Sequence, residues 1–168
     1  MLKLIVSDLH ESLLNDKKEI STRFENILKE LEERNIRFII TTDEPLETIK
    51  LHLKKHNNVI IMFSSDNGIV VNGNNHKNFT QPLDKYTNKG TALKSLQTKL
   101  CLLPQETMVF GRFNDDIEMF KQASFTYAFE ESPSKLKRIA TGVINTNDDD
   151  SICKRIEDYI DKFIYGRI

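Results

Sequence analysis

Short apolar runs alternate with longer amphipathic segments along this chain, and that alternation most constrains its fold. The apolar runs have the length of strands and stand at 2–7 (LKLIVS), 37–42 (RFIITT), 59–65 (VIIMFSS), 107–111 (TMVFG) and 125–129 (FTYAF). A continuous apolar run of this length is typical of a strand that is covered on both faces. Two more extended pieces are expected, one at 68–73 (GIVVNG) as part of a hairpin and one at 142–144 (GVI).

The segments between these runs carry apolar residues at the spacing of one helix face. In 20–36 the residues Ile20, Phe24 and Ile27 recur at this spacing, and Ser21 or Thr22 can cap the start. Helices are also expected at 45–56, 89–100, 115–123, 132–140 and 148–164. Strands that alternate with helices predict a parallel sheet with helices on both faces. We therefore expect residues 1–168 to form one three-layer, Rossmann-like α/β domain.

The composition argues against several other classes of protein. Hydrophobic residues make up 39% of the chain and charged residues 29%, which disfavours disorder. The net charge of -1 supplies no basic field for nucleic acid or for a lipid surface. No signal peptide or long apolar segment is visible, so we expect a cytoplasmic protein with no nucleic-acid or membrane partner. The two cysteines, Cys101 and Cys153, fit neither a metal spacing nor a disulfide framework.

Polar side chains stand where the predicted strands end. Asp8 follows the first run, Thr42 closes the second, and the loop 111–116 (GRFNDD) ends the run at 107–111. Ligands of such sheets bind outside the carboxyl ends of the strands, so these residues are expected to form one site. Asp8 can be a nucleophile, a metal ligand or both, or only a cap. Asp115 and Asp116 suit a divalent metal and equally suit helix capping.

Further side chains are candidates for holding an anion. The hydroxyls of Ser12 and Thr42 suit phosphate oxygens, although such residues are more often caps. Lys89 stands at a helix start, where it can neutralise a bound anion or simply be solvated. His52 and His56 lie four residues apart with no third ligand evident, and we interpret them as surface residues rather than as a zinc site.

Taken in order, these pieces resemble the haloacid dehalogenase superfamily, specifically its Cof-type sugar-phosphatase branch. That branch typically reads DLDGTLL, ATGR, NKG and GDxxND at its four motifs. The counterparts here are DLHESLL (8–14), TTDE (41–44), NKG (88–90) and GRFNDD (111–116), and they keep the order of the family over nearly the whole chain.

The resemblance implies roles for the matched residues. Asp8 corresponds to the nucleophile that forms an aspartyl-phosphate, and His10 stands at the position of the general acid/base. The positions that match phosphate-binding residues are Ser12, Thr42, Lys89 and Asp115. The implied cofactor is Mg²⁺, with Asp8, the backbone carbonyl of His10, and Asp116 as the implied ligands.

The departures from the family pattern fall on its chemistry. His10 replaces an acid, although imidazole can shuttle a proton near neutral pH. Arg112 replaces a direct metal ligand, and a guanidinium there would pair with Asp8 or Asp116 and repel a divalent cation. If the domain has drifted in sequence and binds no ligand, an ion pair between Arg112 and Asp8 is expected to block the pocket. Carboxylates also stand at 43–44 (DE), where glycine and arginine are usual.

A cap domain, which Cof-type proteins insert before the lysine motif, has no room here. Only residues 69–88 are available, enough for a short hairpin, so the site is expected to be open unless a homo-oligomer covers it. One hypothesis is a phosphatase-related protein with eroded motifs and weak or no activity. One alternative is an active capless Mg²⁺-dependent phosphomonoesterase that works through Asp8. The other is a non-catalytic domain, which either serves as an interaction domain or binds a phosphorylated small molecule or other anion through Arg112, Lys89 and Thr42.

Overall fold

The computed structural model describes residues 1–8, 13, 20–43, 53, 56–65, 68–73, 88–145, 150–163 and 165–166. Its strands are β1 (Leu4–Asp8), β2 (Arg37–Thr42), β3 (Val59–Ser65), β4 (Gly68–Gly73), β5 (Thr107–Gly111), β6 (Phe125–Phe129) and β7 (Gly142–Ile144). Its helices are α1 (Thr22–Glu33), α3 (Lys89–Lys99), α4 (Ile117–Phe120), α5 (Ser134–Ile139) and α6 (Ser151–Phe163), with 3-10 turns η1 (Pro104–Glu106) and η2 (Asn114–Asp116).

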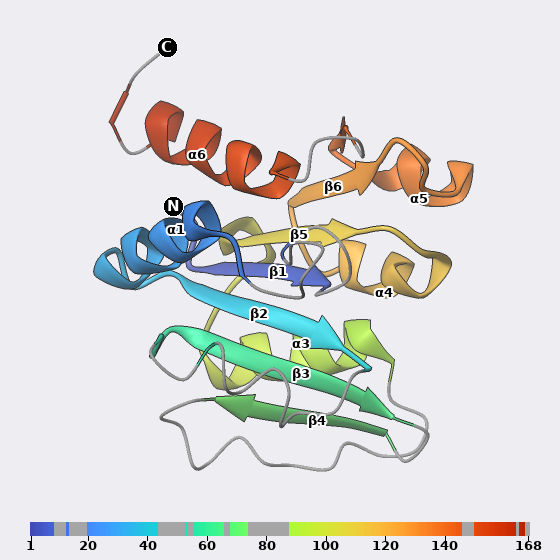
Figure 1. The fold of residues 1–168 in the computed structure, drawn as a ribbon. Coiled ribbons are helices and arrows are strands. Elements are labelled where there is room, and N and C mark those ends of the chain that lie inside the picture. Colours follow the sequence, from blue (N-terminus) through green and yellow to red (C-terminus); the bar gives the residue numbers. More distant parts are fainter. Residues whose placement is uncertain are drawn as a thin grey trace.

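The strands form one sheet in the order β4-β3-β2-β1-β5-β6-β7 (Figure 1). Neighbouring strands are parallel except for β3 and β4, which pair antiparallel as the hairpin predicted at 68–73. The strand β1 lies between β2 and β5. The strands that follow β1 therefore lie on both sides of it, β2 to β4 on one side and β5 to β7 on the other. Sheets of this kind bind ligands at the carboxyl end of the strand where the order reverses, which here is β1.

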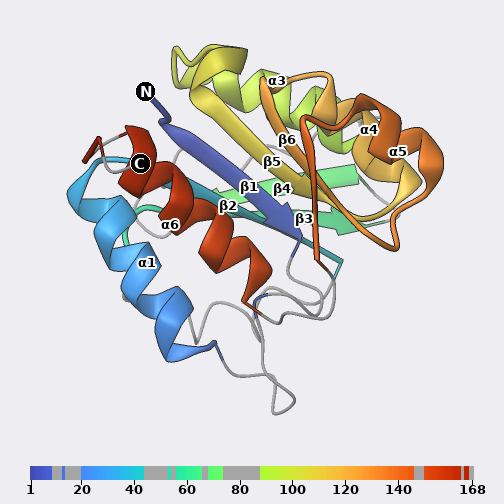
Figure 2. The same cartoon turned by 90° about the horizontal axis from the view of Figure 1, so that it is seen from above.

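Helices cover both faces of the sheet, because successive strand residues point to opposite sides. The helices α1 and α6 lie side by side on one face, and α3, α4 and α5 lie on the other (Figure 2). In β1, Ile5 belongs to the core under α1 and α6, whereas Leu4 and Val6 belong to the core under α3, α4 and α5. The predicted three-layer, Rossmann-like α/β class is confirmed.

The helices α1 and α3 end in the same left-handed turn. Asn35 has φ 56° after α1, and Cys101 has φ 54° after α3. After α3, the Leu102 N–H donates to the carbonyl of Gln97 (2.9 Å), and the Cys101 N–H donates to that of Thr98 (3.2 Å). This is the Schellman motif, in which glycine is the favoured left-handed residue.

Two sequence predictions need correction. The helix expected at 115–123 is instead the 3-10 turn η2 followed by α4, which ends at Phe120. The Asp116 side chain accepts hydrogen bonds from its own loop at the start of this segment. His56 is 2% exposed, so its prediction as a surface residue is wrong. It lies just before β3, where the chain enters the sheet. The helix predicted at 45–56 otherwise lies outside the described residues, apart from Leu53.

Both cysteines are free, Cys101 exposed and Cys153 buried. Across the ranges that the structure describes, no helix is long and apolar enough to cross a membrane.

Candidate active site

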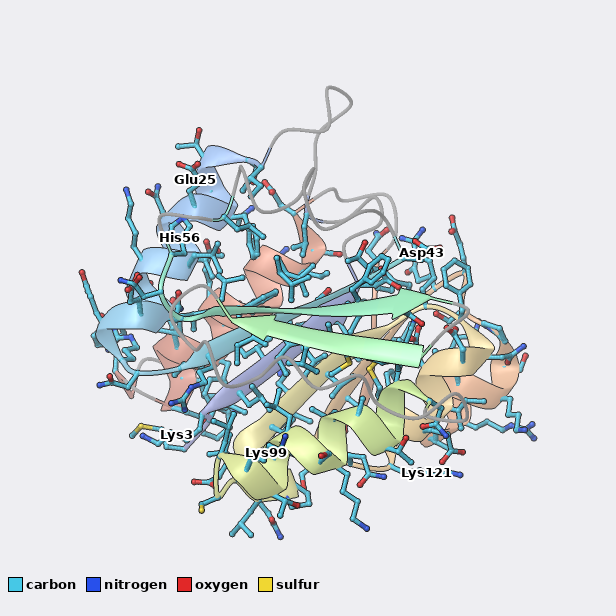
Figure 3. All side chains as sticks on the ribbon, turned by 90° about the horizontal axis from the view of Figure 1, so that it is seen from below. Lys3, Glu25, Asp43, His56, Lys99 and Lys121 are labelled. Carbon is cyan, nitrogen blue, oxygen red and sulfur yellow. The ribbon has the colours of Figure 1, made fainter. Side chains whose placement is uncertain are left out.

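The candidate residues gather at one edge of the sheet, where the parallel strands end. Asp8 ends β1 and Thr42 ends β2. Asp43 follows β2 at this edge, whereas Lys3 lies at the opposite end of the sheet (Figure 3). A cavity of about 480 Å³ opens here, and its lining consists of Asp8, Thr42, Asp43, Ser64, Lys89, Arg112, Phe113 and Asp115. The structure thus brings together side chains from β1, β2, β3, α3 and the loop after β5.

Lys89 occupies the first position of α3, and a capping box fixes the start of that helix there. The Asn88 side chain accepts a hydrogen bond from the Thr91 N–H (2.9 Å), and the Thr91 hydroxyl oxygen accepts one from the Asn88 N–H (3.1 Å). These two bonds satisfy N–H groups that a helix start leaves without partners. The helix therefore begins at a defined residue, and Lys89 is directed from it toward the cavity.

The ammonium group of Lys89 lies among three carboxylates. Its Nζ atom is 2.9 Å from Oδ2 of Asp115, 3.0 Å from Oδ1 of Asp116 and 3.4 Å from Oδ2 of Asp8. Burial alone would lower the pKa of Lys89, but the charges of Asp116 and Asp8 outweigh it and raise that pKa above its ordinary value. Lys89 therefore stays protonated throughout the physiological pH range.

Asp116 ties the loop after β5 to the start of α3. Its Oδ2 atom accepts hydrogen bonds from the N–H groups of Arg112 (2.8 Å) and Phe113 (3.0 Å), while Oδ1 accepts from Lys89. The Asp116 side chain is completely buried. Burial raises the pKa of this carboxyl group, and the charge of Lys89 opposes that rise. The capping role that the sequence left as an alternative to metal binding is thus present, and the ion pair with Lys89, which was not predicted, adds to it.

Two glycines make this close packing possible. A Cβ atom added to Gly90 would lie 2.4 Å from the backbone carbonyl of Glu118, so α3 can approach α4 only without a side chain there. A Cβ atom added to Gly111 would lie 2.6 Å from the Phe120 ring and 2.8 Å from Cβ of Asp116. Such distances are far inside van der Waals contact. These glycines, in the NKG and GRFNDD motifs, set the positions of Lys89 and Asp116.

Arg112 lines the cavity and stacks on an aromatic ring. Its Cζ atom lies 4.6 Å from the centroid of the Phe129 ring, at the end of β6. Asp8 and Asp116 each form an ion pair with Lys89. The Phe129 ring contacts the guanidinium from one face, and the pairing of Arg112 with one of these two carboxylates stays a prediction.

The remaining site residues divide into hydroxyls that line the cavity and positions that lie outside the described residues. Thr42 is 3% exposed and lines the cavity, as does Ser64 near the end of β3. Ser64 and Phe113 were not among the predicted residues, although Ser64 closes an apolar run just as Thr42 does. His10 and Ser12 lie outside the described residues, and so does most of the short hairpin expected at 69–88.

The magnesium ion implied by the resemblance does not fit the side chains described at this edge. No group of three or more His, Cys, Asp or Glu side chains in the described ranges is arranged to hold a metal ion. Both oxygens of Asp116 already accept hydrogen bonds, and Arg112 brings a positive charge to the same cavity. We therefore derive no chemical step through a metal ion.

The fold and the cavity define a Rossmann-like α/β protein that presents charged side chains at the carboxyl edge of its sheet. A model of the haloacid dehalogenase-like hydrolases matches residues 5–86 and 73–156. The chain belongs to this family, which confirms the resemblance read from its motifs.

Curated relatives match the chain over only part of their own length. The chloroplastic endoribonuclease YBEY of Arabidopsis thaliana is 25% identical over 155 residues, which are 92% of this chain and 25% of that protein. A protein of Haemophilus influenzae named "Putative phosphatase" is 26% identical over 83 residues, 49% of this chain and 32% of that protein. The chain therefore spans a quarter to a third of the length of these relatives.

Solved structures share the fold. SMU.1108c from Streptococcus mutans UA159 superimposes with a TM-score of 0.74 at 18% identity, covering 95% of this chain and 99% of that one. The 3-deoxy-D-manno-octulosonate 8-phosphate phosphatase of Moraxella catarrhalis, solved with magnesium, phosphate and KDO, gives a TM-score of 0.68 at 16% identity, covering 98% and 92%. At these identities the likeness concerns the fold alone.

Proposed function

We propose that this domain binds a phosphate group, free or carried by a small molecule, in the cavity at the carboxyl edge of the sheet, and that its phosphatase activity is weak or absent. The observation that carries the proposal is the arrangement around Arg112. It lines the cavity at the position of the expected metal-binding acid, while Asp116 is fully engaged by Lys89 and the backbone.

The binding part of this proposal rests on charge, hydroxyls and size. Lys89 is protonated and directed into the cavity, and the hydroxyls of Thr42 and Ser64 line it. Hydroxyl and ammonium donors are the groups that phosphate oxygens prefer. A volume of about 480 Å³ lies in the range of small-molecule sites. A phosphorylated small molecule fits this site better than RNA does, because the net charge of -1 provides little attraction for a polyanion.

The catalytic part rests on what the nucleophile lacks. Asp8 has a carboxylate that lines the cavity 3.4 Å from Lys89, but Arg112 replaces the acid that would complete a metal site. His10 stands at the acid/base position. Its imidazole can shuttle a proton near neutral pH, but we expect it to serve this reaction less well than the carboxyl group that it replaces. We also propose that residues 1–168 are one core domain, in which 69–88 take the place of a cap.

A second candidate is an active capless Mg²⁺-dependent phosphomonoesterase, which the exposure of Asp8 favours. The Asp8 side chain is 16% exposed and lines the cavity, so it can reach a phosphorus atom. In this mechanism the Asp8 oxygen attacks phosphorus, the alcohol leaves with a proton from His10, and water then hydrolyses the aspartyl-phosphate.

The test combines a binding measurement with a turnover measurement. Calorimetric titration with inorganic phosphate is expected to show binding. Hydrolysis of an aryl phosphate and a phosphosugar panel, with and without Mg²⁺, is expected to show little turnover. Magnesium-dependent turnover that Asp8→Asn abolishes would overturn the proposal in favour of the second candidate. Absence of both binding and turnover would overturn both.

A further inference from the structure

We propose that the ring of Phe113 binds the organic part of the ligand, and that this part carries a flat aromatic ring, as an aryl phosphate or a nucleotide does. This role rests on the proposed phosphate binding and specifies which class of phosphate ester fits the cavity. Phe113 stands at a position where the family motif GDxxND prescribes no residue, so the motif comparison alone gives it no role.

Phe113 is both exposed and part of the cavity wall. Its exposed fraction is 51%, and its side chain lines the cavity beside Lys89 and Asp115. Single apolar side chains on a surface are ordinary, whereas an aromatic side chain in a cavity wall is typical of a small-molecule site. The other large apolar side chains that are exposed in the described ranges do not line the cavity, and they are Met1, Leu103, Ile139, Val143, Phe163 and Tyr165.

The backbone of Phe113 is fixed by a buried carboxylate. The Phe113 N–H donates to Oδ2 of Asp116 at 3.0 Å, and the other oxygen of Asp116 accepts from Nζ of Lys89 at 3.0 Å. One completely buried side chain therefore joins the backbone that carries the ring to the ammonium group. Because the two binding groups are held relative to one another before a ligand arrives, less conformational entropy is lost on binding.

The charged and the apolar parts of the wall differ in depth. The Lys89 side chain is 13% exposed, whereas Phe113 is 51% exposed. A phosphate ester can thus place its charged end at Lys89 and its organic end at the mouth of the cavity. The volume of about 480 Å³ lies in the range of sites that hold whole small molecules, so it leaves room beside a phosphate group.

An aromatic ring is the organic group that gains most from contact with Phe113. Two aromatic rings attract one another through stacked or edge-to-face geometry, in addition to the apolar area that they bury. Nucleobases stack on aromatic side chains in the same way, whatever their identity. A sugar would instead need hydrogen-bond partners for the hydroxyls that leave water, and the Phe113 ring offers none.

The test titrates phenylphosphonate and methylphosphonate into the full chain by calorimetry, in the presence of EDTA. The two ligands share the phosphonate group and a P–C bond that a phosphatase does not hydrolyse, and they differ in the ring. We expect phenylphosphonate to bind about tenfold more tightly. Adenosine 5′-monophosphate, titrated beside them, distinguishes a ring bonded directly to the phosphorus from a ring that a ribose separates from it.

The measured quantity is the ratio of the ring ligand's affinity to that of methylphosphonate, because a general loss of affinity cancels in it. Phe113→Ala is expected to lower the ratio to about one, since the stacking partner is lost. Phe113→Leu keeps an apolar side chain and is expected to give a ratio of about three. Phe113→Tyr keeps the ring and is expected to keep the full ratio.

Phe163→Ala is the matched control. Phe163 is 53% exposed at the end of α6 and does not line the cavity. Its replacement removes an aromatic ring of nearly equal exposure, so it is expected to leave the ratio unchanged. A circular dichroism spectrum at the titration temperature checks that each variant is folded.

The outcomes separate this inference from the proposed function. If neither ring ligand binds more tightly than methylphosphonate, or if Phe113→Ala leaves the ratio unchanged, the inference is overturned and the proposed function stands. A ratio that falls equally in Phe163→Ala overturns the inference as well. Absence of binding by both phosphonates and by inorganic phosphate would instead overturn the proposed function, and this inference with it.

Discussion

Oδ2 of Asp115 lies 2.9 Å from Nζ of Lys89. The Asp115 side chain is 61% exposed and lines the cavity at its rim. The carboxylate contacts the same ammonium group to which the proposed phosphate would bind. Because the Asp115 side chain is exposed, it can turn away from Lys89 into solvent when a ligand binds, and we expect the cost to be small. We therefore expect Asp115 to compete with a phosphate group for Lys89.

Replacing Asp115 by asparagine, the residue usual in the family motif, is expected to strengthen phosphate binding. The change removes one negative charge close to the ligand, which corresponds to about fivefold in affinity. Calorimetric titration with phosphate measures it. Asp158→Asn, which changes the net charge equally on a side chain 56% exposed in α6, is the control. Unchanged or weaker binding in Asp115→Asn would contradict the competition.

Removing Lys89 is expected to destabilise the fold, because it leaves the buried carboxylate of Asp116 without its cation. We expect Lys89→Met to cost about 3 to 5 kcal/mol in the free energy of unfolding. Lys94→Met, on the exposed side of the same helix, is expected to change little. Urea denaturation measures both variants. A double variant that also carries Asp116→Asn is expected to recover part of the loss.

The cost of Lys89→Met is expected to depend on pH in a defined direction. Burial raises the pKa of Asp116 in the folded protein, and loss of the lysine raises it further. A carboxyl group whose folded-state pKa exceeds its unfolded value destabilises the fold above that pKa and ceases to do so below the ordinary value of 3.8. The deficit should therefore be largest at neutral pH and shrink on acidification. A deficit that is constant with pH would contradict this.

Gly90→Ala is expected to weaken both folding and phosphate binding. The added methyl group would lie 2.4 Å from the backbone of Glu118, and backbone cannot yield as a flexible side chain can. The expected cost is about 1 to 3 kcal/mol, with displacement of Lys89. Gly142→Ala is the control, since its methyl group would meet only the Tyr127 ring, at 3.1 Å. Denaturation and phosphate titration of both variants provide the comparison.

Cys101→Gly is expected to stabilise the protein by about 1 kcal/mol, because glycine adopts the left-handed conformation without the steric cost of a Cβ atom. Asn35→Gly, at the matching position after α1, should gain less, because asparagine tolerates this conformation. Thermal denaturation of the two variants tests the ranking. Equal gains, or a loss in Cys101→Gly, would contradict the argument.

The two thiols are expected to differ strongly in reactivity. Burial, together with the nearby charge of Asp150, raises the pKa of Cys153 from 9.0 to about 12, so its thiol stays protonated where an ordinary cysteine forms thiolate. Cys101 is exposed. Iodoacetamide labelling near pH 9, followed by peptide mass spectrometry, should find the label on Cys101 and, in the folded protein, not on Cys153. Unfolding in urea should make both react.

The strands and the α/β class could be predicted, because continuous apolar runs separated by helices are typical of a parallel sheet covered on both faces. The residues at the sheet edge followed from the same logic, since strand ends meet in a parallel sheet. The partner of each side chain could not be predicted. That Lys89 serves three carboxylates depends on the approach of α3 to the loop after β5, and that Arg112 lies on Phe129 depends on a neighbouring strand with no motif.

The buried ion pair between Lys89 and Asp116 gives these two residues a structural role besides their place in the site. These two residues fasten one helix to one loop, so a chain with no remaining turnover would still unfold more easily if either changed. Asp115 lies at the rim with an exposed side chain, so we expect its substitution to affect the stability of the fold less. In this chain Lys89 is therefore expected to be needed for folding as well as for binding a ligand, so its presence does not by itself report on catalysis.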